Sequence, residues 1–364
     1  MFFGECDSKG ARKGRLMQTK ASVIGHFGIG KQLLNGQTIK TKIITEELKA
    51  CIGEEQVLTI DTYGGWKTLV KAPFQVFRAL KCSYNIIILP AHNGLRVFAP
   101  LLVLLRTFLK KRRLHYIVIG GWLPGFLKKR RVLARVLRHF DYIYVETRTM
   151  KTKLESHGFN NICILPNCKK LTIISESDLV YPTEYPLKLC TFSRVMKEKG
   201  IEDAVKAVIG VNDKLGYTGF TLDIFGQIDA GQEAWFNELR GEFPDYIRYL
   251  GEVPYDKSVE VIKEYFVLLF PTHCFTEGIP ATIIDAYSSG VPVISAKWES
   301  FADVVDDGVT GIGYDFNEPS QLTSILLSIS KEPQKFDGMK TNCIHKAKEY
   351  VPEDVICTLC NNLQ

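Results

Sequence analysis

Short runs of β-branched and other apolar residues alternate with helix-length amphipathic segments along most of the chain, and this alternation restricts the possible folds more than any other feature. Two parallel strands need a crossover connection between them, and that connection is usually a helix. The pattern therefore predicts an α/β architecture, in which parallel sheets carry helices on both faces. In the first half of the chain we expect strands at residues 22–26, 57–60, 85–89, 116–119, 142–145 and 162–165.

The alternation is interrupted once and then resumes. Residues 171–186 lose the periodicity and collect turn-forming residues, which is typical of a linker. A chain of 364 residues is long enough for two separate cores. A second set of strands is expected at residues 187–192, 221–225, 247–250, 267–270 and 293–295.

These segments predict two facing, doubly wound domains of the Rossmann type. The expected units are a basic arm over 1–20, a first domain over 21–170, a second domain over 187–345, and a helix over 346–364 that packs back toward the first domain. Open parallel sheets bind ligands beyond the carboxyl ends of their strands. We therefore expect the functional site in the cleft between the two domains.

The segment HCFTEGIPATIIDAYSSGVPVIS, residues 273–295, carries two carboxylates, Glu277 and Asp285, on either side of a predicted helix start. Pro280 suits the first position of that helix. The N–H groups of Gly278 and Ile279 would then point outward and bind phosphate or sugar oxygens. Asp285 lies further along the helix, where a carboxylate can accept hydrogen bonds from the vicinal hydroxyls of a ribose.

The two carboxylates alone leave a second interpretation open, in which they belong to a solvated helix face. A basic loop in the same domain favours a ligand site. The segment LCTFSRVMKEKG, residues 189–200, is a predicted strand followed by Arg194 and Lys199. Two cations at the carboxyl end of a strand suit a diphosphate, which Arg binds by its planar fork and Lys as a point charge.

In four segments the second domain resembles glycosyltransferase family 4, whose members have the GT-B fold. The segments are FSRVMKEKGIEDAVKAV, LDIFGQ, YLGEVPYDKSVEVIKEY and the run from FPTHCFTEGIP to TGIGY at residues 270–314. The resemblance implies that Arg194 and Lys199 hold the diphosphate of a nucleotide sugar and that Glu277 contacts the sugar hydroxyls. It also implies that Asp285 binds the ribose and that Gly278, Ile279 and Pro280 wrap the donor.

The sequence departs from the family pattern in two places of the second domain. The second carboxylate is Asp285 where the family usually has Glu, so this side chain is shorter by one methylene. Ser193 stands where the family often has Gly before the Arg. Asp285 must therefore approach the ribose hydroxyls more closely than a Glu would.

The first domain matches the family more loosely. The resemblance implies that Gly36 and Gln37, at the start of a helix expected from Thr38, approach the donor phosphates. Gly28 and Gly30 suit either such a phosphate loop or a plain turn. Because the spacing is not GxGxxG, it does not predict nicotinamide binding.

Residues on the acceptor side are harder to assign. Many relatives have a His at the end of the strand that corresponds to HYIVIGGW, whereas this chain has Gly120, Gly121 and Trp122. His92, in the expected loop LPAHNG, could face the cleft from the end of its own strand or serve only the loop. Gly121, Trp122 and His92 are therefore the candidate acceptor-side residues, and no general base is assigned.

The resemblance implies a retaining glycosyltransferase that moves a sugar from a nucleoside diphosphate to a glycan or lipid-linked glycan, in bacterial surface polysaccharide synthesis. In such a mechanism the leaving diphosphate can itself take the proton of the acceptor. We expect no cofactor and no catalytic metal, because the sequence has no D-x-D pattern and already supplies a cation pair. The residues do not select among UDP, GDP and dTDP. The alternatives are a nucleotide-sugar epimerase of the same fold and a non-catalytic, membrane-docked nucleotide-binding subunit.

Charge is unevenly distributed along the chain. No acidic residue occurs between Asp61 and Asp141, while 16 of the 46 Lys and Arg residues lie there. The segments RVFAPLLVLLRTFLKKRR and WLPGFLKKRRVLARVLRHF mix these cations with large apolar residues, which is typical of a surface that lies on anionic lipid. The alternative is that the apolar residues belong to an ordinary core and that the cations only keep the protein in solution. No nucleic-acid-binding motif accompanies the charge. We expect a cytoplasmic protein on the inner face of the plasma membrane, since no apolar run reaches the length of a span.

The ten cysteines are irregularly spaced and lie in apolar segments, so they are expected to be reduced thiols buried in the core. Cys357 and Cys360 form one CxxC, which has no second pair to complete a zinc site.

Overall fold

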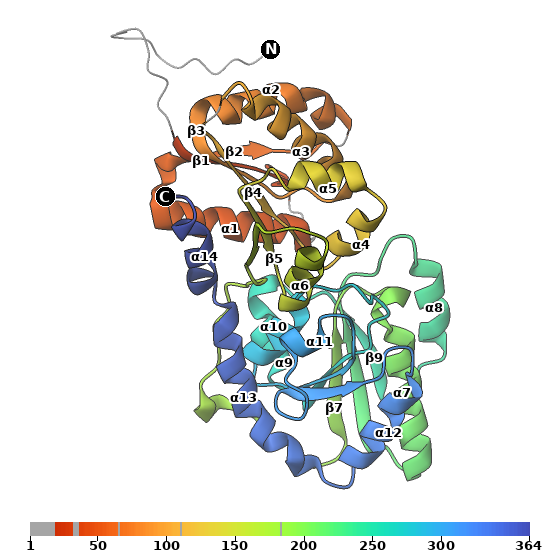
Figure 1. The fold of residues 1–364 in the computed structure, drawn as a ribbon. Helices are drawn as coiled ribbons and strands as arrows, with labels where there is room; N and C mark the ends of the chain where they lie inside the picture. The colour runs from red at the N-terminus through yellow and green to blue at the C-terminus, as the bar shows by residue number, and fades with distance from the viewer. Residues whose placement is uncertain (1–18, 32–35, 65, 110, 183) are drawn as a thin grey trace.

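The computed structural model of the protein describes residues 19–364 apart from residues 32–35, 65, 110 and 183. The predicted basic arm therefore lies outside the described residues, except for its last two positions. The chain forms two α/β domains, the first at the top of Figure 1 and the second at the bottom. Each domain has a six-stranded, all-parallel sheet.

The first sheet has the strand order β2-β1-β3-β4-β5-β6. All six predicted strands of this half exist, with ends displaced by up to three residues. Because the order reverses between β1 and β3, the carboxyl ends of these two strands form a switch point, the place where open α/β sheets usually bind ligands. The strands are β1 (Thr19–Gly25), β2 (Val57–Asp61), β3 (Ser83–Ile88), β4 (Arg113–Ile117), β5 (Tyr142–Val145) and β6 (Ile162–Ile164).

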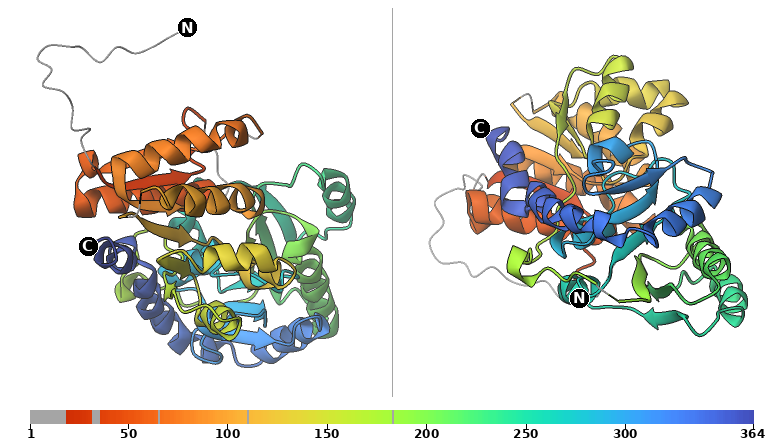
Figure 2. Two further views of the ribbon diagram at one scale, coloured as in Figure 1. Left: turned by 45° about the horizontal axis from the view of Figure 1, so that its top comes forward. Right: turned by 90° about the horizontal axis from the view of Figure 1, so that it is seen from below.

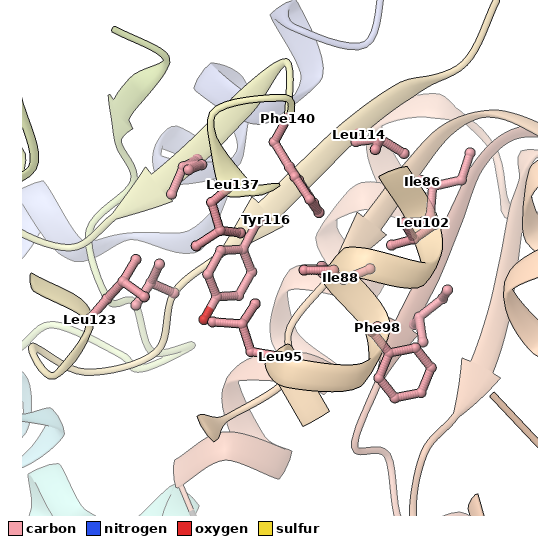
Figure 3. Close-up of a cluster of buried hydrophobic side chains, with 14 of the residues drawn as sticks. Ile86, Ile88, Leu95, Phe98, Leu102, Leu114, Tyr116, Leu123, Leu137 and Phe140 are labelled. Carbon is pink, nitrogen blue, oxygen red and sulfur yellow. The ribbon is translucent and has the colours of Figure 1, made fainter. Parts of the chain in front are cut away.

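Helices cover both faces of the first sheet. One face packs against α1 (Gly36–Ile52) and α14 (Pro352–Asn361). The other face, shown in part in Figure 3, has Ile86 and Ile88 of β3 packed against Leu95 of α3 and around the buried ring of Tyr116. The helices on this second face are α2 (Trp66–Cys82), α3 (His92–Arg106), α4 (Leu123–Lys128), α5 (Arg131–Leu137) and α6 (Arg148–Ser156).

The second sheet has the order β12-β11-β10-β7-β8-β9, so its switch point lies between β7 and β10. The strands are β7 (Leu187–Phe192), β8 (Phe220–Phe225), β9 (Ile247–Gly251), β10 (Val267–Phe270), β11 (Val293–Ala296) and β12 (Gly311–Tyr314). Strand β12 was not predicted from the sequence. Its sequence GIGY has two glycines, which disfavour a strand, and the pairing with β11 supplies the stability that local propensity lacks.

Two groups of helices cover the second sheet. One face carries α7 (Ile201–Leu215), α8 (Glu233–Gly241) and α12 (Ser320–Ile329). The other carries α9 (Ser258–Ile262), α10 (Ala281–Ser288), α11 (Phe301–Val304) and α13 (Asp337–Ala347). Residues 171–186 connect the domains, with a 3₁₀ turn at Glu176–Asp178.

The C-terminal segment differs from the single predicted helix over 346–364. Val351 is extended, as is favoured before Pro352, and this break separates α13 from α14. The helix α13 packs against α10 in the second domain, whereas α14 crosses back and packs against α1 in the first (Figure 2). Asn85 Nδ2 donates to the carbonyl of Leu363 at 3.1 Å, which fixes the end of the chain on the first domain.

The nine cysteines within the described residues are free thiols. The expectation of buried thiols is wrong for Cys51 and Cys357, which are exposed. In the described part of the chain, no helix combines the length and the apolar character needed to cross a membrane.

Candidate functional site

At the switch point of the second sheet, two of the three residues predicted to hold the diphosphate and the sugar of the donor meet. Arg194 and Lys199 follow β7, Glu277 follows β10, and these strands are neighbours in the sheet. Lys199 Nζ forms an ion pair with the carboxylate of Glu277. Both side chains keep about a fifth of their surface exposed, 20% for Lys199 and 18% for Glu277. The predicted cation and carboxylate are therefore in contact and still accessible to a ligand.

The loop after β7 reaches Glu277 because it contains Gly200. This residue has φ +69°, in the left-handed region that favours glycine. A Cβ atom at Gly200 would lie 1.8 Å from the carbonyl oxygen of Pro271, which follows β10. Only glycine allows the two loops to approach this closely, so Gly200 sets the distance between Lys199 and Glu277.

Arg194 also follows β7, but its side chain pairs with a carboxylate that follows the neighbouring strand β8. Its side chain is 47% exposed, and its Nη1 lies 3.5 Å from Oδ2 of Asp229, a residue that the sequence analysis did not identify. An exposed ion pair of this kind contributes about 1 kcal/mol or less, so an anionic ligand can replace the Asp229 carboxylate at little cost.

The start of α10 differs from the prediction in two ways. Pro280 is extended, with ψ 128°, and helix α10 begins one residue later at Ala281. The N–H of Ile279 does not point to an open ligand site, because it donates to Oε2 of Glu146 at 2.9 Å. A carboxylate of the first domain thus occupies one of the two N–H groups that were predicted to bind a ligand.

Glu146 is a buried carboxylate at the contact between the domains, directly after β5. Its Oε1 accepts hydrogen bonds from Lys40 Nζ at 2.6 Å and from the N–H of Gly120 at 3.1 Å, and its Oε2 accepts from Ile279. The side chains of Lys40 and Glu146 are only 3% and 2% exposed. Through these contacts Glu146, which follows β5, connects α1, the loop after β4 and the loop before α10.

Two glycines let the domains approach each other at this point. A Cβ atom at Gly121 would lie 2.4 Å from the carbonyl oxygen of Thr276 and 2.7 Å from that of Glu277. A Cβ atom at Gly278 would lie 2.0 Å from Oε2 of Glu146. Gly121, predicted on the acceptor side, therefore lies directly against the loop that carries Glu277.

Asp285 is buried and paired with a lysine, which fits neither an open ribose site nor a solvated helix face. The residue is 2% exposed, so it is not part of a solvated helix face. Its Oδ1 forms an ion pair with Lys169 and accepts a hydrogen bond from Ser258 Oγ at 2.8 Å. The shorter side chain is thus held inside the protein by a lysine from the segment before the linker, and a ribose would have to displace part of this arrangement.

His92 and Trp122 lie together on the first domain. His92 was predicted in a loop, but it is the first residue of α3. Its ring lies 3.9 Å from the ring of Trp122 and 4.8 Å from that of Phe126, between centroids. Burial lowers the pKa of His92 below its usual value, and the positive charges of Arg130 and Arg96 lower it further. His92 is thus biased toward its neutral form.

The glycine-containing loop after β1 binds a carboxylate of the protein itself. Asp61 accepts hydrogen bonds from the N–H groups of Phe27, Gly28 and Ile29 at 2.9–3.3 Å. Burial acts to raise the pKa of Asp61, but the hydrogen bonds from backbone N–H groups outweigh this effect and hold the pKa below its usual value. This arrangement supports the plain-turn interpretation of Gly28.

Gly36 and Gln37 are the first two residues of α1, which begins two residues before the predicted start at Thr38. Gln37 Nε2 donates to the carbonyl oxygen of Leu89 at 3.3 Å, at the carboxyl end of β3. Both residues therefore lie near the switch point of the first sheet.

Four charged residues near the site were not predicted from the sequence: Glu146, Lys40, Lys169 and Asp229. A signal was available for Glu146, because it follows a predicted strand whose carboxyl end had to face the cleft. Lys40 and Lys169 gave no such signal, since only the tertiary contacts show that they are buried and paired. Within the described residues, no group of three or more His, Cys, Asp or Glu side chains has the arrangement of a metal site.

Comparison with known proteins agrees with this architecture. Residues 186–332 match the family model described as Glycosyl transferases group 1. The amylovoran biosynthesis glycosyltransferase AmsK of Erwinia amylovora is 23% identical over 150 residues, which are 40% of this chain and 36% of that protein. The GtfA subunit of the Streptococcus pneumoniae UDP-N-acetylglucosamine–peptide N-acetylglucosaminyltransferase is 33% identical over 111 residues, 30% of this chain and 20% of that protein. The matched regions thus span about a third or less of these relatives.

Solved structures resemble the whole chain. The structure of Anabaena Alr3699/HepE in complex with UDP and glucose has a TM-score of 0.72 at 15% identity and covers 95% of this chain and 99% of that one. Sucrose-phosphate synthase from Thermosynechococcus elongatus has a TM-score of 0.73 at 15% identity, with 94% and 97% covered. The chain therefore has the GT-B fold, and its second domain matches the group 1 glycosyl transferases.

Proposed function

We propose that the protein is a retaining glycosyltransferase of family 4, which transfers a sugar from a nucleoside diphosphate to a glycan or lipid-linked glycan. The observation that carries this proposal is the contact of Lys199 with Glu277 at the switch point of the second sheet, where Arg194 also follows β7. The family match of residues 186–332 supports it. The solved complexes of Alr3699/HepE with UDP and with UDP-glucose support a nucleotide sugar as the donor.

In the proposed reaction the cations stabilise the leaving group. As the glycosidic bond breaks, negative charge grows on the diphosphate, and Arg194 and Lys199 offset it by charge-assisted hydrogen bonds. Lys199 then contacts the diphosphate as well as Glu277, so its contact with Glu277 weakens. The carboxylate of Glu277 can then also accept hydrogen bonds from the sugar hydroxyls, which hold the sugar in place.

Neither a metal ion nor a general base is required in this scheme. Two cations neutralise the diphosphate, and the leaving oxygen itself takes the proton of the attacking hydroxyl on the same face of the sugar. His92 is exposed on the acceptor side and biased to its neutral form, which suits an acceptor-binding role. Asp285 is proposed to reach a ribose only if Lys169 yields part of its ion pair.

Related proteins support polysaccharide synthesis as the setting. The names of AmsK and of the O-antigen chain mannosyltransferase B of Escherichia coli both refer to surface polysaccharides. The basic, acid-free stretch between Asp61 and Asp141 favours work at the inner face of the plasma membrane, where acceptors carried on lipid diphosphates lie.

The proposal is tested by the melting temperature of wild type and of Arg194→Ala with UDP, GDP, dTDP, CDP and NAD, without added metal. A ligand that binds only the folded state raises the free energy of unfolding, by about 2.7 kcal/mol when its concentration is 100 times Kd. This stabilisation raises the melting temperature. We expect one nucleoside diphosphate to raise the melting temperature of wild type. For the same rise, Arg194→Ala should need at least a tenfold higher concentration of this ligand. No rise with any saturating diphosphate would refute donor binding.

A second assay separates transfer from the alternatives. Incubation with the identified nucleotide sugar and a glycan acceptor should consume both. Interconversion of the nucleotide sugar without an acceptor would indicate an epimerase, and binding without turnover would indicate a non-catalytic subunit.

A further inference from the structure

A pocket of about 660 Å³ lies on the first domain, between α3 and the junction of α4 and α5. Five cations line it, and no carboxylate does: Arg96, Lys128, Lys129, Arg130 and Arg131. None of the ion pairs recorded among the described residues involves these five side chains. So many uncompensated cations around one pocket repel each other, and a ligand with at least two negative charges relieves that repulsion.

The remaining wall of the pocket is apolar. It consists of Pro100 from α3 and of Val132, Leu133 and Val136 from α5. Val132 is 72% exposed, although it lies on a helix whose Leu133 and Leu137 reach the core. An apolar wall below a cationic rim fits an amphiphile, whose hydrocarbon covers the valines while its anionic group meets the cations.

Aromatic rings connect this pocket to the proposed reaction site. The guanidinium of Arg130 lies 3.7 Å from the centroid of the Phe126 ring, and that of Arg96 lies 5.4 Å from it. The Phe126 ring in turn contacts Trp122 and His92, with centroids 5.1 and 4.8 Å apart. Trp122 directly follows Gly121, whose Cα packs against the backbone of Glu277.

We propose that this pocket binds the diphosphate and the first part of the hydrocarbon chain of a lipid-linked acceptor. Its cations hold the diphosphate, and the attached sugar then extends over Phe126, Trp122 and His92 toward the loop of Glu277. The inference rests on the proposed function, because it assigns the acceptor of that reaction. It adds the residues that hold the diphosphate and the hydrocarbon chain of the acceptor.

The test is isothermal titration of geranyl diphosphate, a soluble lipid diphosphate, into the full chain. Since Arg194 and Lys199 also attract diphosphates, the titrations use the Arg194→Ala background. The test variant adds Lys129→Gln with Arg131→Gln, which removes two exposed charges of the pocket. The matched control adds Lys214→Gln with Lys331→Gln, which removes two exposed charges of the second domain. Melting temperatures of all variants establish that they are folded.

We expect geranyl diphosphate to bind, and the pocket variant to weaken its affinity by about tenfold or more, as for the loss of hydrogen bonds to a charged group. The control pair should change the affinity less than twofold. Inorganic pyrophosphate should bind at least tenfold more weakly than geranyl diphosphate, because it leaves the apolar wall uncovered.

Four results would overturn the assignment. These are no binding of geranyl diphosphate, an equal loss in the control pair, equal affinity for inorganic pyrophosphate, and equal affinity for monomeric dihexanoylphosphatidylglycerol. The last would make the pocket a general site for anionic lipid. Because these titrations contain no nucleotide, they stand apart from the nucleotide test, and failure of either proposal is recognisable without the other.

Discussion

At the scale of single residues, Glu146 is the most consequential side chain that the sequence analysis missed. It is buried, it neutralises the buried Lys40, and it accepts a hydrogen bond from the N–H of Ile279 in the other domain. Removing one partner of a buried ion pair leaves an uncompensated charge, whereas replacing both partners by neutral residues costs far less. The effect of a substitution at Glu146 therefore depends on what happens to Lys40.

We predict that Glu146→Ala lowers the free energy of unfolding by about 3–5 kcal/mol, because Lys40 stays buried without its carboxylate. The double variant Glu146→Gln with Lys40→Met should recover most of this loss. Urea denaturation of the two variants and wild type measures the difference. Equal losses in both variants would show that the ion pair is not what stabilises this contact.

At the scale of elements, the crossing of α14 onto the first domain depends on buried polar side chains as well as on apolar packing. His115 of β4 lies 3.1 Å from Asn85 Oδ1 and 3.1 Å from the Tyr144 hydroxyl. Asn362, just past α14, donates to the same Tyr144 hydroxyl at 3.2 Å. The ring of His115 therefore lies within the network that holds the C-terminal segment.

Burial, with a smaller effect of the nearby Arg113, lowers the pKa of His115 from 6.5 to about 3. Between these values the unfolded chain binds a proton that the folded chain does not, so stability falls as the pH falls from about 6.5 toward 3. We predict that His115→Gln reduces this slope by up to about 1.4 kcal/mol per pH unit. Urea unfolding of both proteins at several pH values from 7 to 4 measures it, and parallel curves would contradict the prediction.

At the scale of the whole molecule, the uneven charge is matched by exposed apolar residues on the first domain. Val70, Phe74 and Phe77 of α2 are 69%, 71% and 50% exposed, and Leu104 of α3 is 61% exposed. These helices pack side by side on one face of the first sheet, and α5 packs against α3 (Figure 1). The surface formed by α2, α3 and α5 therefore combines exposed apolar side chains with the basic stretch. A surface that binds anionic lipid needs both kinds of residue.

We predict that the protein sediments with phosphatidylglycerol vesicles and that added salt weakens this binding, since salt screens the attraction of the basic residues. The variant Phe74→Ser with Phe77→Ser should bind at least tenfold more weakly. Tyr217→Ser with Leu250→Ser, which removes exposed apolar residues from the second domain, should not. Equal binding of both variants would exclude α2 from the membrane contact.

The sequence by itself determined most of the strands of this protein and the motifs at their ends. Eleven of the twelve strands follow from local apolar runs, because a buried parallel strand is apolar throughout. The placement of Arg194, Lys199 and Glu277 at one edge of the second sheet followed from a general rule, since the carboxyl ends of parallel strands lie at the same edge. These features depend on residues close together in the chain.

The tertiary structure alone decided how charges are paired across distant segments. Lys40 meets Glu146 from 106 residues away, and Lys169 meets Asp285 from 116 residues away. Strand β12 forms because β11 is beside it, and the N–H of Ile279 is occupied because the domains touch there. No periodicity or spacing encodes such contacts, because they depend on how complete elements pack. Packing therefore placed Glu146 in the contact between the domains and withdrew Asp285 from solvent.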